Sequence, residues 1–175
     1  MDQRQWVEGI IKKYSRALIR YAQNILKDFE VACEVVQECY IKLMGQDQVT
    51  TKILGWLYRE VRNRSIDIWR RQRKQEPLSI EKENDLSSDH PNPLEGLEAR
   101  ENMQHLLKAI QTLSARDQEI LTLKYTEGLS YQEIAEVMGL TATNVGYILC
   151  QAVKSIRDDV LSARDARIME KKYGE

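Results

Sequence analysis

The segment 52–74, KILGWLYREVRNRSIDIWRRQRK, is the part of the chain on which the fold prediction depends most. It has no proline, and no glycine after Gly55, so it predicts one long helix. On a helical wheel, the side chains expected to face a core recur at i, i+3, i+4 and i+7: Leu54, Leu57, Tyr58, Val61, Ser65 and Ile68. The opposite side carries Trp56, Arg59, Asn63, Asp67, Arg70 and Lys74.

The outward side of this predicted helix has two interpretations. In the first it binds a nucleic-acid strand, because cations meet phosphates, an aromatic ring stacks on bases and an amide reads a base edge. In the second it is a solvated charged surface, with Trp56 packed against a neighbouring helix. Taken alone, the helix favours neither interpretation.

The composition predicts a folded, helical chain. Of the 175 residues, 42% are hydrophobic and 30% are charged, which is typical of globular proteins rather than disordered ones. The 8 glycines and 3 prolines leave few turns, which favours long helices and an all-α fold. No apolar run is long enough to span a bilayer, and no charged-then-apolar leader is present. We therefore expect a cytoplasmic protein without membrane insertion.

The charge is unevenly distributed along the sequence. The formal net charge of −1 by itself argues against a nucleic-acid-binding protein. Residues 52–74, however, hold eight Lys and Arg side chains against Glu60 and Asp67, a net charge of about +6. Residues 75–94 and 95–160 are each about −4 by the same count. The positive charge is therefore concentrated on the predicted helix.

The cysteines and histidines do not have the spacing of a metal site. Cys33, Cys39 and Cys150 are odd in number and form no CxxC pair, and neither His90 nor His105 lies at a ligand spacing from a cysteine. No set of nucleophile and base converges in the sequence either. We therefore expect no metal, no cofactor, no catalytic residue and no enzyme activity.

Two further helices precede the basic segment. Residues 4–26 predict a packing helix whose apolar face is Trp6, Ile10, Tyr14 or Ala17, Leu18, Tyr21 and Ile25. Residues 29–44 predict a second helix whose core stripe is Ala32, Val35, Val36, Cys39 and Leu43. Its other face gathers Glu34, Gln37, Glu38 and Ile41. This face is either a docking patch for a basic protein or an ordinary surface with one exposed aliphatic side chain.

The segment 75–97 separates two parts of the chain. It contains all three prolines, and it is rich in Ser, Asp, Asn and Glu, as a flexible acidic linker would be. A short polar loop, 45–51, precedes the basic helix. We therefore predict two small helical domains, at 1–74 and 98–160, joined by the linker 75–97 and followed by a C-terminal tail at 161–175 that frays.

The second domain has the pattern of a helix-turn-helix. Helices are predicted at 98–112 and 116–126, followed by a short helix that opens with the capping box Ser130-Tyr-Gln-Glu133. The side chains of 98–112 expected to face inward are Met103, Leu106, Leu107 and Ile110. Gly139 ends the short helix, and Thr141 can cap a final helix at about 142–160. The buried side of this final helix is expected to include Ala152, Val153 and Ile156. The side chains expected to meet base edges are Thr143, Asn144, Tyr147 and Gln151.

Three blocks of this sequence together resemble the extracytoplasmic-function sigma factors of the sigma-70 superfamily: EVVQECYIKLM (34–44), ILGWLYREVRNRSIDIWRR (53–71) and LSARDQEILTLKYTEGLSYQEIAEVMGLTATNV (113–145). The resemblance runs from about Tyr14 to Ile156, with the blocks in the family's order. It implies a factor that binds core RNA polymerase, directs promoter recognition, promoter opening and transcription initiation, and is held by an anti-sigma protein.

The resemblance also implies roles for individual residues. The surface that docks on the clamp helices of the polymerase β′ subunit is matched by Glu34, Gln37, Glu38 and Ile41. In the part that reads and opens the promoter minus-ten element, Trp56 matches an aromatic that helps to separate the strands, and Asn63 matches a residue that contacts an unstacked base. The phosphates would be held by Arg59, Arg62, Arg64, Arg70 and Arg71.

The block 113–157 resembles the reader of the minus-thirty-five element, which also rests on the polymerase β flap. In the family its last helix usually carries several basic residues, whereas the corresponding run here is VGYILCQAVKSI. Phosphate neutralisation supplies much of the affinity for duplex DNA. We therefore expect this part to bind duplex DNA modestly, and most of the attraction for promoter DNA to come from Lys52–Lys74.

Two alternative functions remain open at this stage. One is a helix-turn-helix transcriptional regulator with an N-terminal partner domain, against which the basic face of 52–74 and the patch at 34–41 both argue. The other is a sigma-like interaction protein with weakened promoter recognition, which the uncharged last helix favours.

Overall fold

A computed structural model describes residues 3–45, 52–75 and 97–173 of the chain. Every regular element among these residues is a helix, so the predicted all-α fold is confirmed. Most of the predicted loop 45–51 and of the predicted acidic linker 75–97 lies outside the described residues. None of the described helices is long and apolar enough to cross a membrane.

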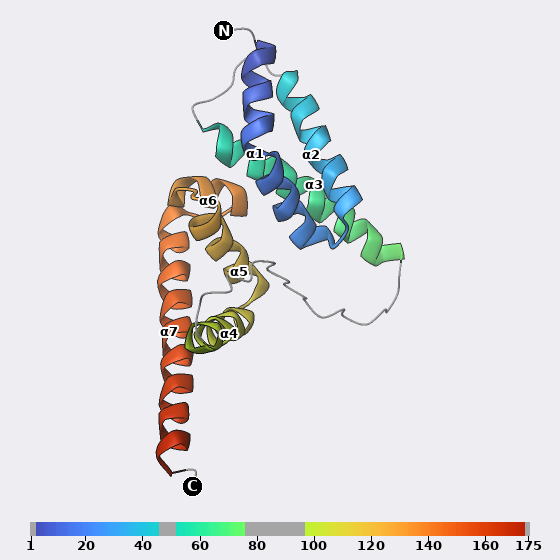
Figure 1. Cartoon of the computed structure of the whole chain (residues 1–175). Coiled ribbons are helices and arrows are strands. Elements are labelled where there is room, and N and C mark those ends of the chain that lie inside the picture. The colour runs from blue at the N-terminus through green and yellow to red at the C-terminus, as the bar shows by residue number, and fades with distance from the viewer. Residues whose placement is uncertain (1–2, 46–51, 76–96, 174–175) are drawn as a thin grey trace. The chain divides into compact units, whose positions relative to one another are not determined.

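The helices form two compact units (Figure 1). The first unit contains α1 (Gln3–Leu26), α2 (Phe29–Met44), α3 (Ile53–Gln75) and α6 (Tyr131–Met138). The second contains α4 (Leu97–Gln111), α5 (Ala115–Leu121), the π-helical turn η1 (Thr122–Thr126) and α7 (Ala142–Tyr173). The predicted C-terminal domain, 98–160, spans α4 to α7, and its helix α6 packs within the first unit, on α3.

In the first unit, α1, α2 and α3 pack against one another around a shared apolar core. The core stripe predicted for α2 is fully buried, and Asp28 caps this helix by accepting hydrogen bonds from the backbone N–H groups of Glu30 and Val31 at 2.9 and 3.1 Å. The ring of Tyr58 is buried and meets the ring of Tyr21 edge-on, with centroids 5.1 Å apart. These contacts fix which side of α3 faces outward.

Two of the predicted apolar faces differ from the structure. On α1, Val7, Ala22 and Leu26 are buried, whereas Trp6, Tyr14 and Ile25 are only half-buried. On α3, Leu57, Tyr58, Val61 and Ser65 are buried as predicted, while Leu54 and Ile68 are half-buried. Ile10, Leu18 and Tyr21 of α1 are buried as predicted, so the stripe differs mainly at its two ends, where Val7 is buried rather than Trp6 and Leu26 rather than Ile25.

Helix α6 begins and ends as its sequence predicts. The Ser130 hydroxyl accepts a hydrogen bond from the Glu133 backbone N–H, and the Glu133 carboxylate accepts one from the Ser130 backbone N–H at 2.8 Å. Gly139 closes the helix in the left-handed conformation, with φ of 67°. The predicted capping box and glycine stop are both confirmed.

The second unit differs from the prediction in three places. The helix predicted at 116–126 ends at Leu121 and continues as the π-helical turn, in which the Glu127 N–H donates to the Thr122 carbonyl. Met103 and Leu106 of α4 were expected inside but are exposed, while Ala109 is buried. Helix α7 continues to Tyr173, so the expected fraying from residue 161 is wrong. Its last turns are rich in strong helix formers, which explains the extension.

Candidate nucleic-acid interface

The outward side of α3 divides into two halves that differ in exposure. In the C-terminal half, Asn63, Arg70 and Arg71 are exposed, as are Arg73 and Lys74. In the N-terminal half the predicted contact residues are only half-buried: Trp56, Arg59 and Arg62. The cations and the amide that are most accessible to a nucleic-acid strand therefore lie in the C-terminal half of α3.

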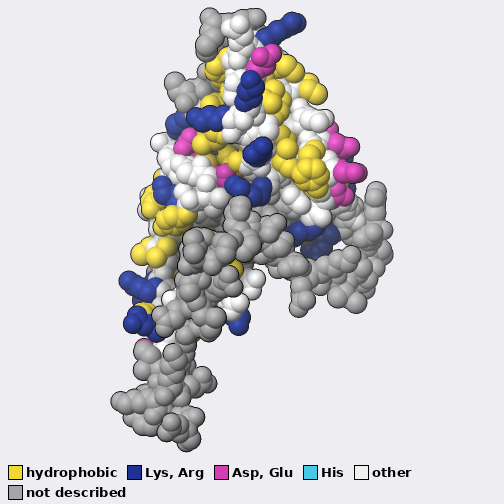
Figure 2. All heavy atoms as spheres, viewed as in Figure 1, with side chains coloured by type: hydrophobic (Ala, Val, Ile, Leu, Met, Phe, Trp, Pro, Cys, Tyr) yellow, Lys and Arg dark blue, Asp and Glu magenta, His cyan; other side chains and the backbone are white. Residues whose placement is uncertain are grey.

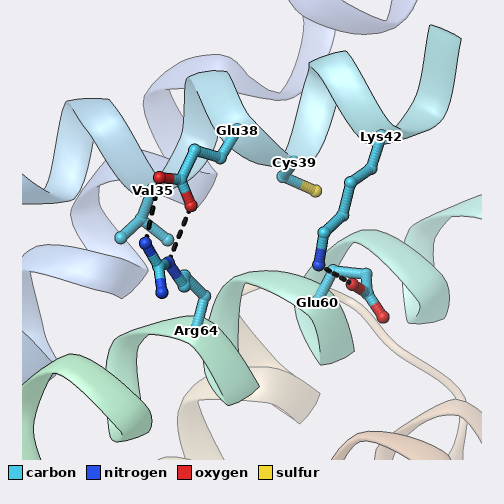
Figure 3. A pocket seen from close by; sticks show the side chains of 6 residues that line it. All are labelled: Val35, Glu38, Cys39, Lys42, Glu60 and Arg64. Carbon is cyan, nitrogen blue, oxygen red and sulfur yellow. Dashed lines mark hydrogen bonds and ion pairs between the residues drawn. The ribbon is translucent and has the colours of Figure 1, made fainter. Parts of the chain in front are cut away.

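Arg64 points toward α2 rather than along the outward side with Asn63 (Figure 3). Its Nε and Nη2 atoms donate to the two carboxylate oxygens of Glu38, at 2.7 and 3.0 Å. This bidentate hydrogen bond, followed by the charge of Glu38, raises the pKa of Arg64 above its ordinary value. Arg64 was predicted to contact DNA and Glu38 to contact polymerase, but in the structure the two side chains bind each other.

A second ion pair lies one helical turn away between the same helices. The Lys42 Nζ atom is 3.0 Å from Oε2 of Glu60. Cys39 lies between the two ion pairs, and together with Val35 they line a small pocket (Figure 3). Burial raises the pKa of the Cys39 thiol to about 12, so this cysteine stays protonated and structural. The two exposed ion pairs add modestly to the packing of α3 on α2, which rests on the buried apolar core.

The outer face of α2 carries the predicted patch, and all of its members are exposed: Glu34, Gln37, Glu38 and Ile41. The Ile41 side chain is 64% exposed, which is unusual for an isoleucine. Met44, one helical turn further, is also exposed and was missed in the sequence. Its i+3 spacing from Ile41 is the signal that would have found it. Figure 2 shows acidic side chains beside hydrophobic ones over α2.

Trp69 of α3 is a second exposed aromatic, outside the outward set predicted from the helical wheel. Its ring is exposed, and the guanidinium carbon of Arg73 lies 4.8 Å from the ring centroid. The spacing of four residues between an aromatic and an arginine on one helix is the signal for this contact. It places a stacking surface on the same helix as Asn63, Arg70 and Arg71.

The first turns of α7 present uncharged side chains, and all four predicted base-contacting residues are exposed: Thr143, Asn144, Tyr147 and Gln151. Tyr147 is 65% exposed. Lys154 is the first basic residue of this helix, and Arg157 follows it one turn later. Val153 was expected on the buried side but is exposed. The surface of α7 therefore has hydrogen-bonding groups but little positive charge near its start.

Comparisons with known proteins identify the family. Residues 10–75 match the model of sigma-70 region 2, and residues 103–156 match that of sigma-70 region 4. The ECF RNA polymerase sigma factor SigM of Bacillus subtilis is 25% identical over 86% of this chain and 93% of its own length. The chain belongs to the extracytoplasmic-function group of the sigma-70 family. As a sigma factor, it acts with RNA polymerase in transcription initiation.

Other sigma factors are similar over nearly the whole chain. RNA polymerase sigma factor YlaC of Bacillus subtilis is 23% identical over 94% of this sigma factor and 98% of its own length. Among solved structures, the sigma factor RpoE of Bartonella quintana, crystallised with the anti-sigma factor NepR, has a TM-score of 0.61 at 20% identity. That comparison covers 87% of this chain and 95% of RpoE, and at this identity it shows a shared fold.

Proposed function

We propose that α3 is the helix through which this sigma factor binds and opens promoter DNA. The observation that supports the proposal is the placement of Asn63, Arg70 and Arg71 together on the exposed half of a helix whose segment has a net charge of about +6. The opposite side of α3 is fixed by its packing on α1 and α2. The cations would hold the phosphates of the strand, and the amide of Asn63 would contact an unstacked base.

We assign the two aromatic side chains of α3 to separate steps. Trp69, with Arg73 over its ring, offers a face on which a base of the displaced strand can stack. Trp56 is half-buried and lies in the N-terminal half, where it would help to hold the strands apart. Arg59 and Arg62 would hold phosphates in that half. Arg64 has a smaller part in DNA binding, since its guanidinium is paired with Glu38.

We propose that the exposed stripe of α2 docks on core RNA polymerase. Glu34, Gln37, Ile41 and Met44 lie at spacings of three and four residues, so they share one face of the helix. Two exposed apolar side chains flanked by a carboxylate and an amide suit a partner surface that is apolar at its centre and basic at its rim. The clamp helices of the β′ subunit, which sigma factors of this group use, are the proposed partner.

The two predicted domains are assigned to different promoter elements. We propose that residues 98–160 form the part that meets the minus-thirty-five element and the β flap, with the contacts to bases made by Thr143, Asn144, Tyr147 and Gln151. Residues 1–74 form the part that meets polymerase and the minus-ten element. The whole protein acts in the cytoplasm as a binding factor and not as an enzyme, and an anti-sigma protein holds it, as NepR is crystallised with RpoE.

A second candidate function is supported by the uncharged start of α7. A sigma-like protein that keeps the polymerase surface but reads promoters weakly would bind core polymerase without directing specific starts. Run-off transcription separates the two functions, with sigma-free core polymerase, the purified chain and genomic fragments. Specific transcripts support the sigma function, and binding to core without specific starts would support the alternative.

The proposed docking stripe of α2 is tested by placing a charge at its apolar centre, Ile41. Ile41→Asp should weaken binding to core polymerase by about 10-fold or more, because a buried unpaired carboxylate is costly in an interface. Phe29→Asp is the matched control, since Phe29 is 58% exposed at the first position of α2, about three turns before Ile41. The measurement is equilibrium binding to labelled core polymerase. If both variants lost the same affinity for core polymerase, the docking surface would not be centred on Ile41.

A further inference from the structure

Helix α6 packs on the N-terminal half of α3, and it approaches α3 tightly at Gly55. Gly55 is buried, and a Cβ atom at this position would lie 3.1 Å from Cγ and 3.2 Å from Cβ of Glu133. Glycine is unfavourable inside a helix, so its presence here is explained by the approach of the second helix. The two helices meet where α3 has no side chain.

The capping box of α6 determines which part of Glu133 meets α3. The Glu133 carboxylate is turned to Ser130, where it accepts from the backbone N–H at 2.8 Å and from the hydroxyl at 2.6 Å. The methylene groups of Glu133 are left to fill the space over Gly55. The contact is therefore apolar at its centre, and it is held by the same hydrogen bonds that begin α6.

An ion pair lies beside this apolar contact. The Lys52 Nζ atom is 3.2 Å from Oε1 of Glu136, and the two side chains are 43% and 42% exposed. Exposed ion pairs of this kind contribute little and weaken with salt. Helix α6 has two glutamates and no basic residue, so it brings negative charge to the start of the basic segment. The contact is specific in its fit but weak enough to be reversible.

We propose that α6 acts as an intramolecular lid on α3, and this inference rests on the proposed role of α3 in binding a DNA strand. The lid packs over Gly55 in the N-terminal half of α3, where Trp56, Arg59 and Arg62 are half-buried. In the other half, Asn63, Arg70 and Arg71 are exposed. In the free protein the first half of α3 is masked by α6. A strand that occupies the full helix displaces α6, and the apparent affinity for the strand is reduced by the fraction of closed protein.

A reversible tether tests the lid in the full-length chain. Lys52→Cys and Glu136→Cys are introduced together with Cys33→Ala and Cys150→Ser, which remove the half-buried and exposed native thiols and leave buried Cys39. A short bismaleimide with a disulfide in its spacer links the two new thiols through thioether bonds, and reductant then cleaves the spacer. The probe is a fluorescent single-stranded 15-mer at low salt, and the single Lys52→Cys variant with the same reagent is the control.

The tethered protein should bind the 15-mer about 10-fold more weakly than the cleaved protein, since closure removes the competent state. Gly55→Leu should bind it more tightly than the native chain, because the side chain excludes α6 from α3 while a leucine favours the helix. Equal affinity of the tethered and cleaved proteins, or failure of the cross-link to form within one chain, would overturn the lid and leave the role of α3 intact. Absence of binding in every form, at a salt concentration where α3 should attract the strand, would contradict the proposed role of α3 itself.

Discussion

Helices α3 and α7 are both predicted to meet promoter DNA, but they differ in charge. Segment 52–74 carries eight basic residues, and Arg70 and Arg71 are exposed on its C-terminal half. The first basic residue of α7 is Lys154, after three turns of uncharged side chains. Phosphate contacts supply affinity, whereas contacts to base edges supply sequence preference. From this difference we propose that α3 provides the attraction for DNA and that α7 contributes discrimination with little affinity.

The largest expected effect is on promoter opening, at the exposed amide of α3. Asn63→Ala should lower the rate of open-complex formation by about 10-fold, the usual cost of losing a contact to a base. Core polymerase binding should stay unchanged, because α2 and not α3 carries the proposed docking stripe. Permanganate footprinting of the promoter is the measurement. Asn24→Ala, at an exposed position on α1, is the matched control and should open promoters as the native chain does.

A smaller effect, on affinity for duplex DNA, is expected when a positive charge is added to the first turns of α7. Gln151→Arg adds one phosphate-binding group to an exposed position, so affinity for duplex promoter DNA should rise by about 3-fold to 10-fold at moderate salt. The gain should disappear as salt is increased. Fluorescence anisotropy with duplex DNA measures it. An unchanged affinity would mean that α7 does not lie on the DNA, and the comparison between the two helices would fail.

The smallest effect is expected at Arg64, which is one of the predicted phosphate contacts. Its guanidinium is engaged by Glu38, so Arg64→Ala should weaken DNA binding less than Arg70→Ala does. The free energy of unfolding of the Arg64→Ala variant should fall by about 1 kcal/mol or less, as for other exposed ion pairs. Chemical denaturation and anisotropy measure the two quantities. A loss of DNA affinity as large as that of Arg70→Ala would show that Arg64 leaves Glu38 to bind phosphate.

Much of the fold could be predicted because its signals are local. The α2 stripe, the Ser130–Glu133 capping box and the glycine stop at Gly139 each depend on residues within one or two turns, and all are confirmed. The packing of α6 on α3 could not be predicted, because it joins residues far apart in the sequence. The glycine at position 55 is explained only by the close approach of Glu133, which the sequence does not show. The two ends of the buried stripe of α1 were missed for the same reason, since a helical wheel does not say which side chains the neighbouring helices accept.

The candidate site was predicted residue by residue but not in its pairings. The wheel separated the outward residues of α3 from the core, and the exposed positions of Asn63, Asp67, Arg70 and Lys74 agree with it. It could not show that Arg64 and Glu38 face each other across two helices, because helical spacing describes a single helix. Met44 and Trp69 were overlooked because hydrophobic residues in an amphipathic helix are ordinarily assigned to its core.

The salt dependence of promoter binding tests the central claim most directly. Two double variants remove the same charge from the two helices: Arg70→Ala with Arg71→Ala on α3, and Lys154→Ala with Arg157→Ala on α7. Each is assembled with core polymerase, and its affinity for a promoter fragment is measured over a range of salt concentrations. The α3 variant should reduce the slope of log K against log salt by about 2, one unit for each lost phosphate contact, and the α7 variant should leave it nearly unchanged. An equal or larger reduction in the α7 variant would contradict the account.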